Sequence, residues 1–198
     1  MSGGVEYSTF VCGIGGQGIQ LVAKMVALAA SNEDRFVMFN GAYGGEMRGG
    51  KSMATIHIGD TPLRALPVAA RANAAVVLHH RFWEDPSSRM DRDALLVVDA
   101  ETASTVTAGP EQTLIPIPAS EIAREIGSPL VTGMALISAF NAITGAVQHQ
   151  SLLAAMRKLV PAHRAQHVER NARALDAGRE AAHDLRHRFE LRPAGVAA

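Results

Sequence analysis

The chain has 198 residues, enough for one domain with a core of its own, and its 19 Lys and Arg residues balance 19 Asp and Glu residues. This balance gives no sign of the basic face with which proteins bind nucleic acids.

The only cysteine cannot form an internal disulfide, and this chain cannot hold an iron–sulfur cluster unaided, because such clusters need several thiolates. Residues 1–6 lack the basic and apolar regions of a secretory signal, and no apolar run approaches the about 20 residues of a membrane span. We therefore expect a cytoplasmic protein that binds neither nucleic acid nor membrane.

The first predicted unit is a strand, a glycine-rich turn and a helix. Residues 9–12 form a short apolar run typical of a buried parallel strand, which makes Cys12 a core side chain. Apolar residues then recur at helical spacing from 17 to 30. Between these elements, residues 13–18 read Gly-Ile-Gly-Gly-Gln-Gly. Because unpaired backbone N–H groups point out of a helix start, this turn suits an anion or a close backbone contact.

A second glycine-rich segment follows the second predicted strand. The apolar residues 36–39 predict that strand, and residues 41–50 then contain five glycines around Tyr43, Glu46 and Arg48. A segment with so few apolar side chains has little to bury, so we interpret it as a contact site. We expect the two glycine segments to lie on the same rim of the sheet.

The rest of the chain alternates between predicted strands and helices. Alternating residues favour an exposed or edge strand over 52–58, and continuous apolar runs favour inner parallel strands over 74–78 and 94–98. A shorter strand is predicted over 113–118, where two prolines favour a sheet edge or a strand end. The predicted helices cover residues 120–126, 132–144, 151–159 with Ser151 as its cap, and 161 to about 188. Together these elements predict an α/β fold with a mostly parallel sheet and a long C-terminal helix. We expect one domain over 1–190 and a flexible tail over 191–198.

The predicted helix over residues 132–144 is apolar on nearly every side, with Met134, Ile137 and Phe140 among its side chains. A helix of this kind is buried all round, and we expect part of its cover to come from a partner protein. The isolated chain would then expose this surface and be poorly soluble.

The first glycine segment matches the dinucleotide-binding fingerprint through Gly13, Gly15 and Gly18. The match is incomplete, because Asn40 stands where an acidic residue should bind the ribose at the end of the second strand. We therefore favour contact with another phosphate-bearing ligand or with a subunit over a bound NAD or FAD. A purely structural turn is the remaining alternative.

Other catalytic and metal-binding patterns are weak. The pairs His163/His167 and His183/His187 can each share a helical face, but they lack the metalloprotease pattern, so we interpret them as solvated and predict no metal site. His79 and His80 follow an inner strand, where ligands bind in α/β sheets, but a structural role is favoured there too. With no serine-hydrolase elbow and no Walker lysine, we predict no catalytic residue in this chain. A ligand-type turn without catalytic groups is typical of one part of a larger enzyme.

The two glycine motifs, residues 13–18 and 43–50 (Tyr-Gly-Gly-Glu-Met-Arg-Gly-Gly), together resemble the gamma subunit of the 2-oxoacid:acceptor (ferredoxin) oxidoreductases. This family acts on pyruvate, 2-oxoglutarate, 2-oxoisovalerate or phenylglyoxylate, and the resemblance extends in weaker form to about Gly145. It implies a Rossmann-like three-layer α/β sandwich with helices on both faces of the sheet. It also implies a complex with alpha, beta and ferredoxin-like delta subunits, which supply thiamine diphosphate, Mg²⁺ and [4Fe-4S] clusters. Such a complex decarboxylates a 2-oxoacid to an acyl-coenzyme A and passes electrons to ferredoxin or an NAD-linked acceptor.

The resemblance implies that this chain holds no cofactor alone, is inactive alone, helps to assemble the complex and covers the coenzyme A site. It also implies contact roles for residues of both motifs. These residues are Gly13, Gly15, Gly16, Gln17, Gly18, Tyr43, Glu46, Arg48, Gly49 and Gly50. From the residues alone, Arg48 suits a phosphate or a partner carboxylate, with Glu46 as its anchor; alternatively the two only pair and brace the loop. A free-standing NAD(P)-binding protein is the alternative function.

Overall fold

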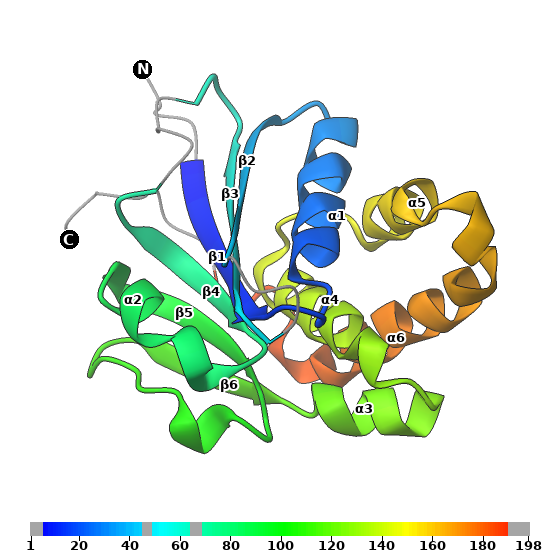
Figure 1. The fold of residues 1–198 in the computed structure, drawn as a ribbon. Helices are drawn as coiled ribbons and strands as arrows, with labels where there is room; N and C mark the ends of the chain where they lie inside the picture. The colour runs from blue at the N-terminus through cyan, green and yellow to red at the C-terminus, as the bar shows by residue number, and fades with distance from the viewer. Residues whose placement is uncertain (1–5, 45–48, 64–68, 190–198) are drawn as a thin grey trace.

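The computed structural model describes residues 6–44, 49–63 and 69–189, and its centre is a six-stranded sheet in the order β2-β3-β1-β4-β5-β6 (Figure 1). Strands β1, β4, β5 and β6 pair in parallel, whereas β3 runs antiparallel to both β1 and β2. The strand bounds are β1 (Glu6–Ile14), β2 (Phe36–Tyr43), β3 (Lys51–Gly59), β4 (Ala72–Val77), β5 (Met90–Asp99) and β6 (Thr113–Ile117). The predicted mostly parallel sheet and the edge position of β6 are confirmed.

Most helices cover one face of the sheet, and the short α2 lies on the other (Figure 1). The helix bounds are α1 (Ile19–Asn32), α2 (Glu84–Ser87), α3 (Ala119–Ile126), α4 (Thr132–Thr144), α5 (His149–Leu159) and α6 (Val168–Ala181). Among the residues described, no helix combines the length and apolarity needed to cross a bilayer. The predicted three-layer α/β architecture is confirmed, with a thick helical layer on one side and a thin one on the other.

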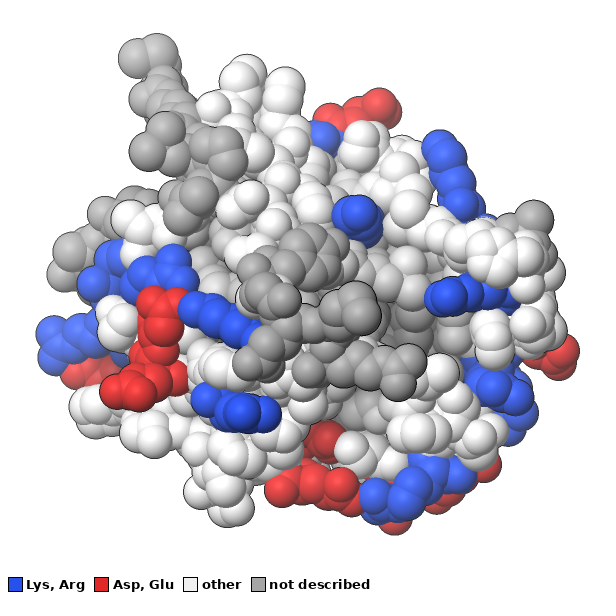
Figure 2. Space-filling view, viewed as in Figure 1, with Lys and Arg blue, Asp and Glu red and all other residues white. Residues whose placement is uncertain are grey.

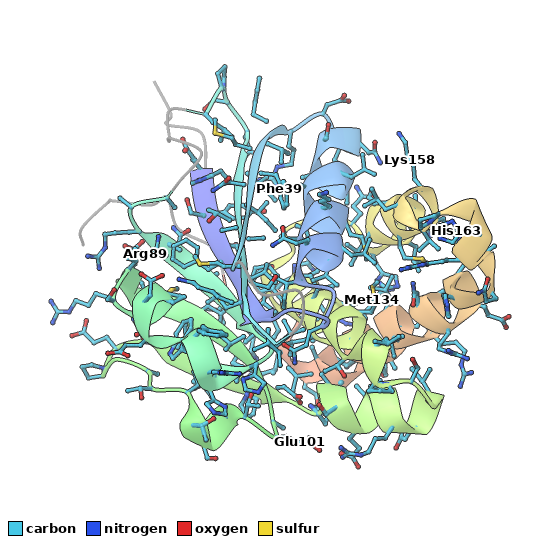
Figure 3. The ribbon with its side chains drawn as sticks, in the orientation of Figure 1. Phe39, Arg89, Glu101, Met134, Lys158 and His163 are labelled. Atoms are coloured by element: carbon cyan, nitrogen blue, oxygen red, sulfur yellow. The ribbon has the colours of Figure 1, made fainter. Side chains whose placement is uncertain are left out.

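The alternation of strand side chains builds a core on each face of the sheet. Val11 of β1 belongs to the larger core, under α1 and α3–α6, and its neighbour Phe10 belongs to the smaller core with Trp83 beside α2. The side chains in Figure 3 fill the space between sheet and helices, where Met134 is 3% exposed. On the face shown in Figure 2, basic and acidic side chains are interspersed, in keeping with their equal numbers.

Helix α4 is covered by this chain itself, so the prediction that it exposes a surface for a partner is wrong. Ten of its residues are buried, and α6 packs closely along it. The close approach depends on Gly178 of α6, since a Cβ there would lie 2.0 Å from the carbonyl oxygen of Ala135. The apolar sides of α4 therefore face the sheet and the neighbouring helices.

Three further expectations need correction. Strand β3 is neither exposed nor at an edge: it lies between β1 and β2, and its polar His57 is buried because the ring bonds Ser8 Oγ at 2.8 Å. Helix α5 begins at His149 with Gln148 as its cap residue, not at Ser151. The C-terminal helix is α6, flanked by the 3₁₀ turns η4 (Ala162–His167) and η5 (His183–Leu185), rather than one helix over 161–188. The predicted tail lies outside the described residues.

Candidate functional site

The two glycine segments meet at the end of strand β1. The N–H of Gly15 donates to the carbonyl of Gly50 at 2.8 Å, and the N–H of Gly49 donates to the carbonyl of Gly15 at 3.2 Å. Pairing of β1 with β3 produces this contact, since Ile14 is opposite Lys51 and each glycine segment continues beyond that pair. The expectation that both segments lie on one rim is confirmed for their described residues. We call residues 13–18 with Gly49 and Gly50 the glycine rim.

The glycines of the rim divide into packed and open positions. Gly13 is packed, because a Cβ there would lie 2.5 Å from Gln17 Oε1 and 2.7 Å from Ile19 Cδ1. Gly16, Gly18 and Gly49 have φ angles of 104°, 76° and 73°, which side chains rarely adopt, and nothing lies within 4 Å of their missing Cβ atoms. The open positions therefore present bare backbone to whatever approaches the rim.

Gln17 braces the rim from inside. Its Oε1 accepts the N–H of Ile14 at 2.9 Å, and its Nε2 donates to the carbonyl of Leu78 at 3.4 Å. The side chain thereby ties the turn to the end of β4, and its predicted ligand contact stays a prediction. Tyr43 ends β2 and pairs through its backbone with Ser52.

Glu46 and Arg48 lie outside the described residues, so the structure tests neither their predicted contact role nor the alternative that they only pair with each other.

Two helices begin at this rim. α1 starts directly after Gly18, and α4 packs onto the same turn, because a Cβ on Gly133 would lie 3.2 Å from the carbonyl oxygen of Gln17. Neither helix has an acidic residue in its first turn. The positive ends of two helix dipoles therefore act at the rim without a carboxylate to neutralise them, which favours an anionic ligand.

The structure adds Arg81 to the rim, and it places His79 and His80, which the sequence interpretation had weighed, beside it. Arg81 is exposed, and its Nη1 donates to the carbonyl of Gly49 at 3.5 Å. His79 Nδ1 accepts the N–H of Arg81 at 3.1 Å, and the His79 ring stacks on His80 with centroids 4.7 Å apart. Partial burial, followed by the nearby His80 and Arg81, lowers the pKa of His79. The available signal was the position of these residues after an inner parallel strand.

A second basic group at the rim is already paired. Lys51, at the start of β3, and Arg89 both contact the carboxylate of Asp85. The hydrogen bond from Lys51 is the main reason why the pKa of Asp85 is lowered. Arg81 is therefore better placed than Lys51 to meet an incoming anion.

The sheet order argues against a dinucleotide site. In the dinucleotide-binding fold the second strand lies beside the first, which brings its acidic residue to the ribose. Here the antiparallel β3 separates β2 from β1, and Asn40 pairs with Thr55 of β3. The residue at the fingerprint's acidic position is thus one strand too far from the first glycine turn.

Cys12 lies in the core, as the sequence interpretation expected, whereas His163, His167 and His183 lie on 3₁₀ turns rather than on one long helix. Cys12 is 3% exposed, and burial raises the pKa of its thiol to about 12. His163, His183 and His187 are exposed, and within the described parts of the chain no three His, Cys, Asp or Glu side chains gather as a metal site would require. These observations support a core role for the thiol and solvated roles for the three exposed histidines.

The sequence matches the family model described as pyruvate ferredoxin/flavodoxin oxidoreductase over residues 8–181. It is 29% identical over 177 residues to 2-oxoglutarate synthase subunit KorC from Methanocaldococcus jannaschii, covering 87% of this chain and 92% of the relative. It is also 30% identical over 152 residues to pyruvate synthase subunit PorC from Methanothermobacter marburgensis, covering 75% and 84%.

Solved structures share the fold. The gamma subunit of a keto/oxoacid ferredoxin oxidoreductase from Geobacter sulfurreducens has a TM-score of 0.75 and 25% identity, covering 90% of this chain and 99% of that one. The 2-oxoglutarate:ferredoxin oxidoreductase of Magnetococcus marinus has a TM-score of 0.81 over 96% of this chain and 33% of that longer chain; at 18% identity it shows the fold alone. A free-standing nucleotide-binding protein is not favoured by these relatives. The chain belongs to the pyruvate ferredoxin/flavodoxin oxidoreductase family, and it is a gamma subunit of a multisubunit 2-oxoacid:ferredoxin oxidoreductase.

Proposed function

We propose that the glycine rim of this gamma subunit contacts coenzyme A in a complex that converts a 2-oxoacid into an acyl-coenzyme A. The observation that carries the proposal is the meeting of open glycine backbone and two helix N-termini at one rim. The names of relatives support the reaction class, since they are subunits of 2-oxoglutarate synthase and pyruvate synthase. The Magnetococcus marinus structure, which has the same fold, holds coenzyme A and succinyl-CoA.

The residues of the rim fit the phosphate groups of coenzyme A. Gly16, Gly18 and Gly49 leave room for an oxygen to reach backbone N–H groups, which bind phosphate well at helix starts. Arg81 adds a guanidinium beside Gly49, and such a group forms paired hydrogen bonds with phosphate oxygens. When bound, coenzyme A supplies the thiol that takes up the acyl group. This chain's contribution is to bind and orient the phosphate-bearing part.

We assign the remaining cofactors to partner subunits. Thiamine diphosphate, Mg²⁺ and [4Fe-4S] clusters belong in this proposal to the alpha, beta and ferredoxin-like delta subunits, and ferredoxin or an NAD-linked protein takes up the electrons. The chemistry of Cys12 supports the division, because a thiol with a pKa of about 12 inside the core is not available as a thiolate ligand. The gamma subunit is then inactive alone.

A matched pair of substitutions at Gly18 tests the coenzyme A contact. Asn and Asp have the same shape and both tolerate a positive φ, so Gly18→Asn and Gly18→Asp differ in one negative charge at an open position. In the assembled complex, we expect Gly18→Asp to raise the KM for coenzyme A about tenfold relative to Gly18→Asn, the effect of about 1.4 kcal/mol of repulsion. The KM for the 2-oxoacid serves as the control and should be the same in both variants.

The assay is coenzyme-A-dependent reduction of methyl viologen with pyruvate or 2-oxoglutarate as substrate. An equal KM for coenzyme A in the two variants, in complexes of normal subunit composition, would contradict the proposed contact. Failure of both variants to assemble would instead show that the rim serves subunit contacts.

A further inference from the structure

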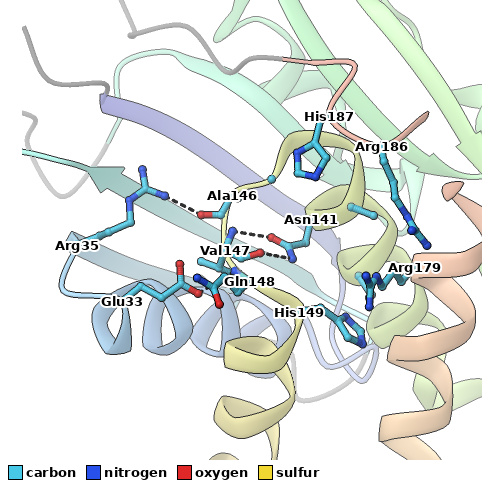
Figure 4. Close-up of a pocket in the computed structure, with 13 residues that line it drawn as sticks. Glu33, Arg35, Asn141, Ala146, Val147, Gln148, His149, Arg179, Arg186 and His187 are labelled. Atoms are coloured by element: carbon cyan, nitrogen blue, oxygen red, sulfur yellow. Dashed lines mark hydrogen bonds between the residues drawn. The ribbon is translucent and has the colours of Figure 1, made fainter. Parts of the chain in front are cut away.

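A cavity of about 490 Å³ lies beyond the C-terminal end of α1. It is bounded by the end of α1, by residues 145–148 before α5, and by the end of α6 with the residues that follow it (Figure 4). The glycine rim lies at the other end of α1, whose 14 residues span about 21 Å at 1.5 Å per residue. We call this cavity the basic cavity, because basic residues outnumber the one acidic residue in its lining. Its ionisable lining residues are Glu33, Arg35, His149, Arg179, Arg186 and His187.

Two of the arginines offer unused hydrogen-bond donors. Arg179 makes no hydrogen bond or ion pair with any residue that the structure describes. Arg186 donates through Nη2 to Glu180 Oε2 at 3.3 Å, but its Nε is buried and has no partner among the described residues. Figure 4 shows both arginine side chains on the α6 side of the cavity. A buried donor without an acceptor is costly, so an acceptor from outside this chain would be favoured there.

Three other ionisable side chains of the cavity are already engaged. Arg35 donates to the carbonyl of Ala146 at 2.7 Å and pairs with Asp60, and His149 Nε2 lies 2.8 Å from Asp176 Oδ1. Glu33 accepts the N–H of Gln148 at 2.7 Å, so its carboxylate is held at the start of α5. Arg179 therefore has an unpaired guanidinium among the described residues, and Arg186, although it pairs with Glu180, keeps a donor without a partner there, so the cavity favours an anionic ligand.

We propose that the basic cavity binds a small organic anion that carries two or more carboxylate or phosphate groups. Guanidinium groups bind both kinds of group through paired hydrogen bonds, and a cavity of this volume is typical of small-molecule sites. The cavity and the glycine rim lie at opposite ends of α1, so this ligand would occupy a site of its own. It therefore acts as an effector or a stabilising ligand of the gamma subunit, with α1 and α4 as the elements shared by both sites.

The test is calorimetric titration of the purified full chain with citrate, for carboxylates, and with inorganic phosphate. Potassium chloride at the same ionic strength controls for screening. We expect saturable binding of at least one of the two probes, and Arg179→Ala should weaken it about tenfold, as expected for the loss of a charge-assisted hydrogen bond. Arg173→Ala is the matched control, because Arg173 is an exposed arginine on the same helix that does not line the cavity.

A second measurement locates the ligand independently of the glycine rim. In ¹H–¹⁵N spectra the bound probe should shift the amides of residues 145–149 and leave those of residues 15–18 unchanged. Gly18→Asp should bind the probe normally, so failure of the coenzyme A proposal and failure of this one are distinguishable. Absence of binding above the chloride control, equal binding by Arg179→Ala, or shifts only at residues 15–18 would each overturn the inference.

Discussion

The close crossing of α4 and α6 makes Gly178→Ala the sharpest test of the packing. A Cβ at this position would lie 2.0 Å from the carbonyl oxygen of Ala135 and 2.7 Å from its Cα, whereas ordinary contact begins near 3.4 Å. These obstacles are backbone atoms, so the two helices have to move apart. Overpacking of this kind costs about 3 kcal/mol. Replacing glycine by alanine within a helix otherwise stabilises the folded state by about 1 kcal/mol, because alanine has the higher helix propensity.

The net expectation is a loss of about 2 kcal/mol in the free energy of unfolding, which lowers the Tm of a chain of this size by about 4–8 °C. Urea unfolding of the purified chain measures the change in free energy, and thermal unfolding measures the change in Tm. Arg173→Ala compared with Arg173→Gly gives the glycine-to-alanine gain at an exposed position of the same helix. If Gly178→Ala is as stable as the wild type or more stable, the close approach of α4 and α6 is refuted.

Two further predictions concern Cys12 and Gln17. Burial raises the pKa of Cys12 from its ordinary 9.0 to about 12, so the thiol loses its proton at a lower pH in the unfolded chain than in the folded one. The contribution of this thiol to the free energy of unfolding is therefore fully present below pH 9. It falls by about 1.4 kcal/mol per pH unit between pH 9 and 12. In urea unfolding measured from pH 8 to 12, Cys12→Ala should remove this part of the fall. An unchanged dependence of the free energy of unfolding on pH would argue against burial of the thiol. Tyr7, whose pKa is also raised to about 12, causes a fall of its own above pH 10 in both chains. Gln17→Ala removes the acceptor for the N–H of Ile14 and the donor to the carbonyl of Leu78, and should cost about 2 kcal/mol in urea unfolding. Gln150→Ala, on the first turn of α5, is the control, and equal stability of the two variants would show that Gln17 does not brace the turn.

Local sequence patterns predicted the elements that depend on local signals. The apolar runs of β1, β4 and β5 and the glycine turn before α1 specify their own conformations, because burial and backbone freedom are properties of those residues. The motifs carried the family resemblance for the same reason. Conversely, β3 alternates as an exposed strand does, and only its place beside β1 gives His57 a buried partner in Ser8.

Helix α4 shows the limit of arguing from one element. Its sequence shows that nearly every side of the helix is apolar, but it does not show which residues or which molecule cover those sides. Gly178, more than thirty residues later, allows α6 to supply the cover from the same chain. The sequence patterns that favoured a partner therefore described burial correctly and assigned it to the wrong molecule.

The same division holds for the sites. Sequence alone determined that residues 13–18 and the segment around Tyr43 are poor in side chains and suited to contact, because glycine content is a local property. Tertiary structure decided that they form one rim with the N-terminus of α4 and with Arg81, since sheet order and helix packing bring these distant residues together. It also decided that Arg179 and Arg186 share a cavity with Glu33, which follows α1, and with residues of α4 and α5. Which donors are unpaired there depends on these neighbours.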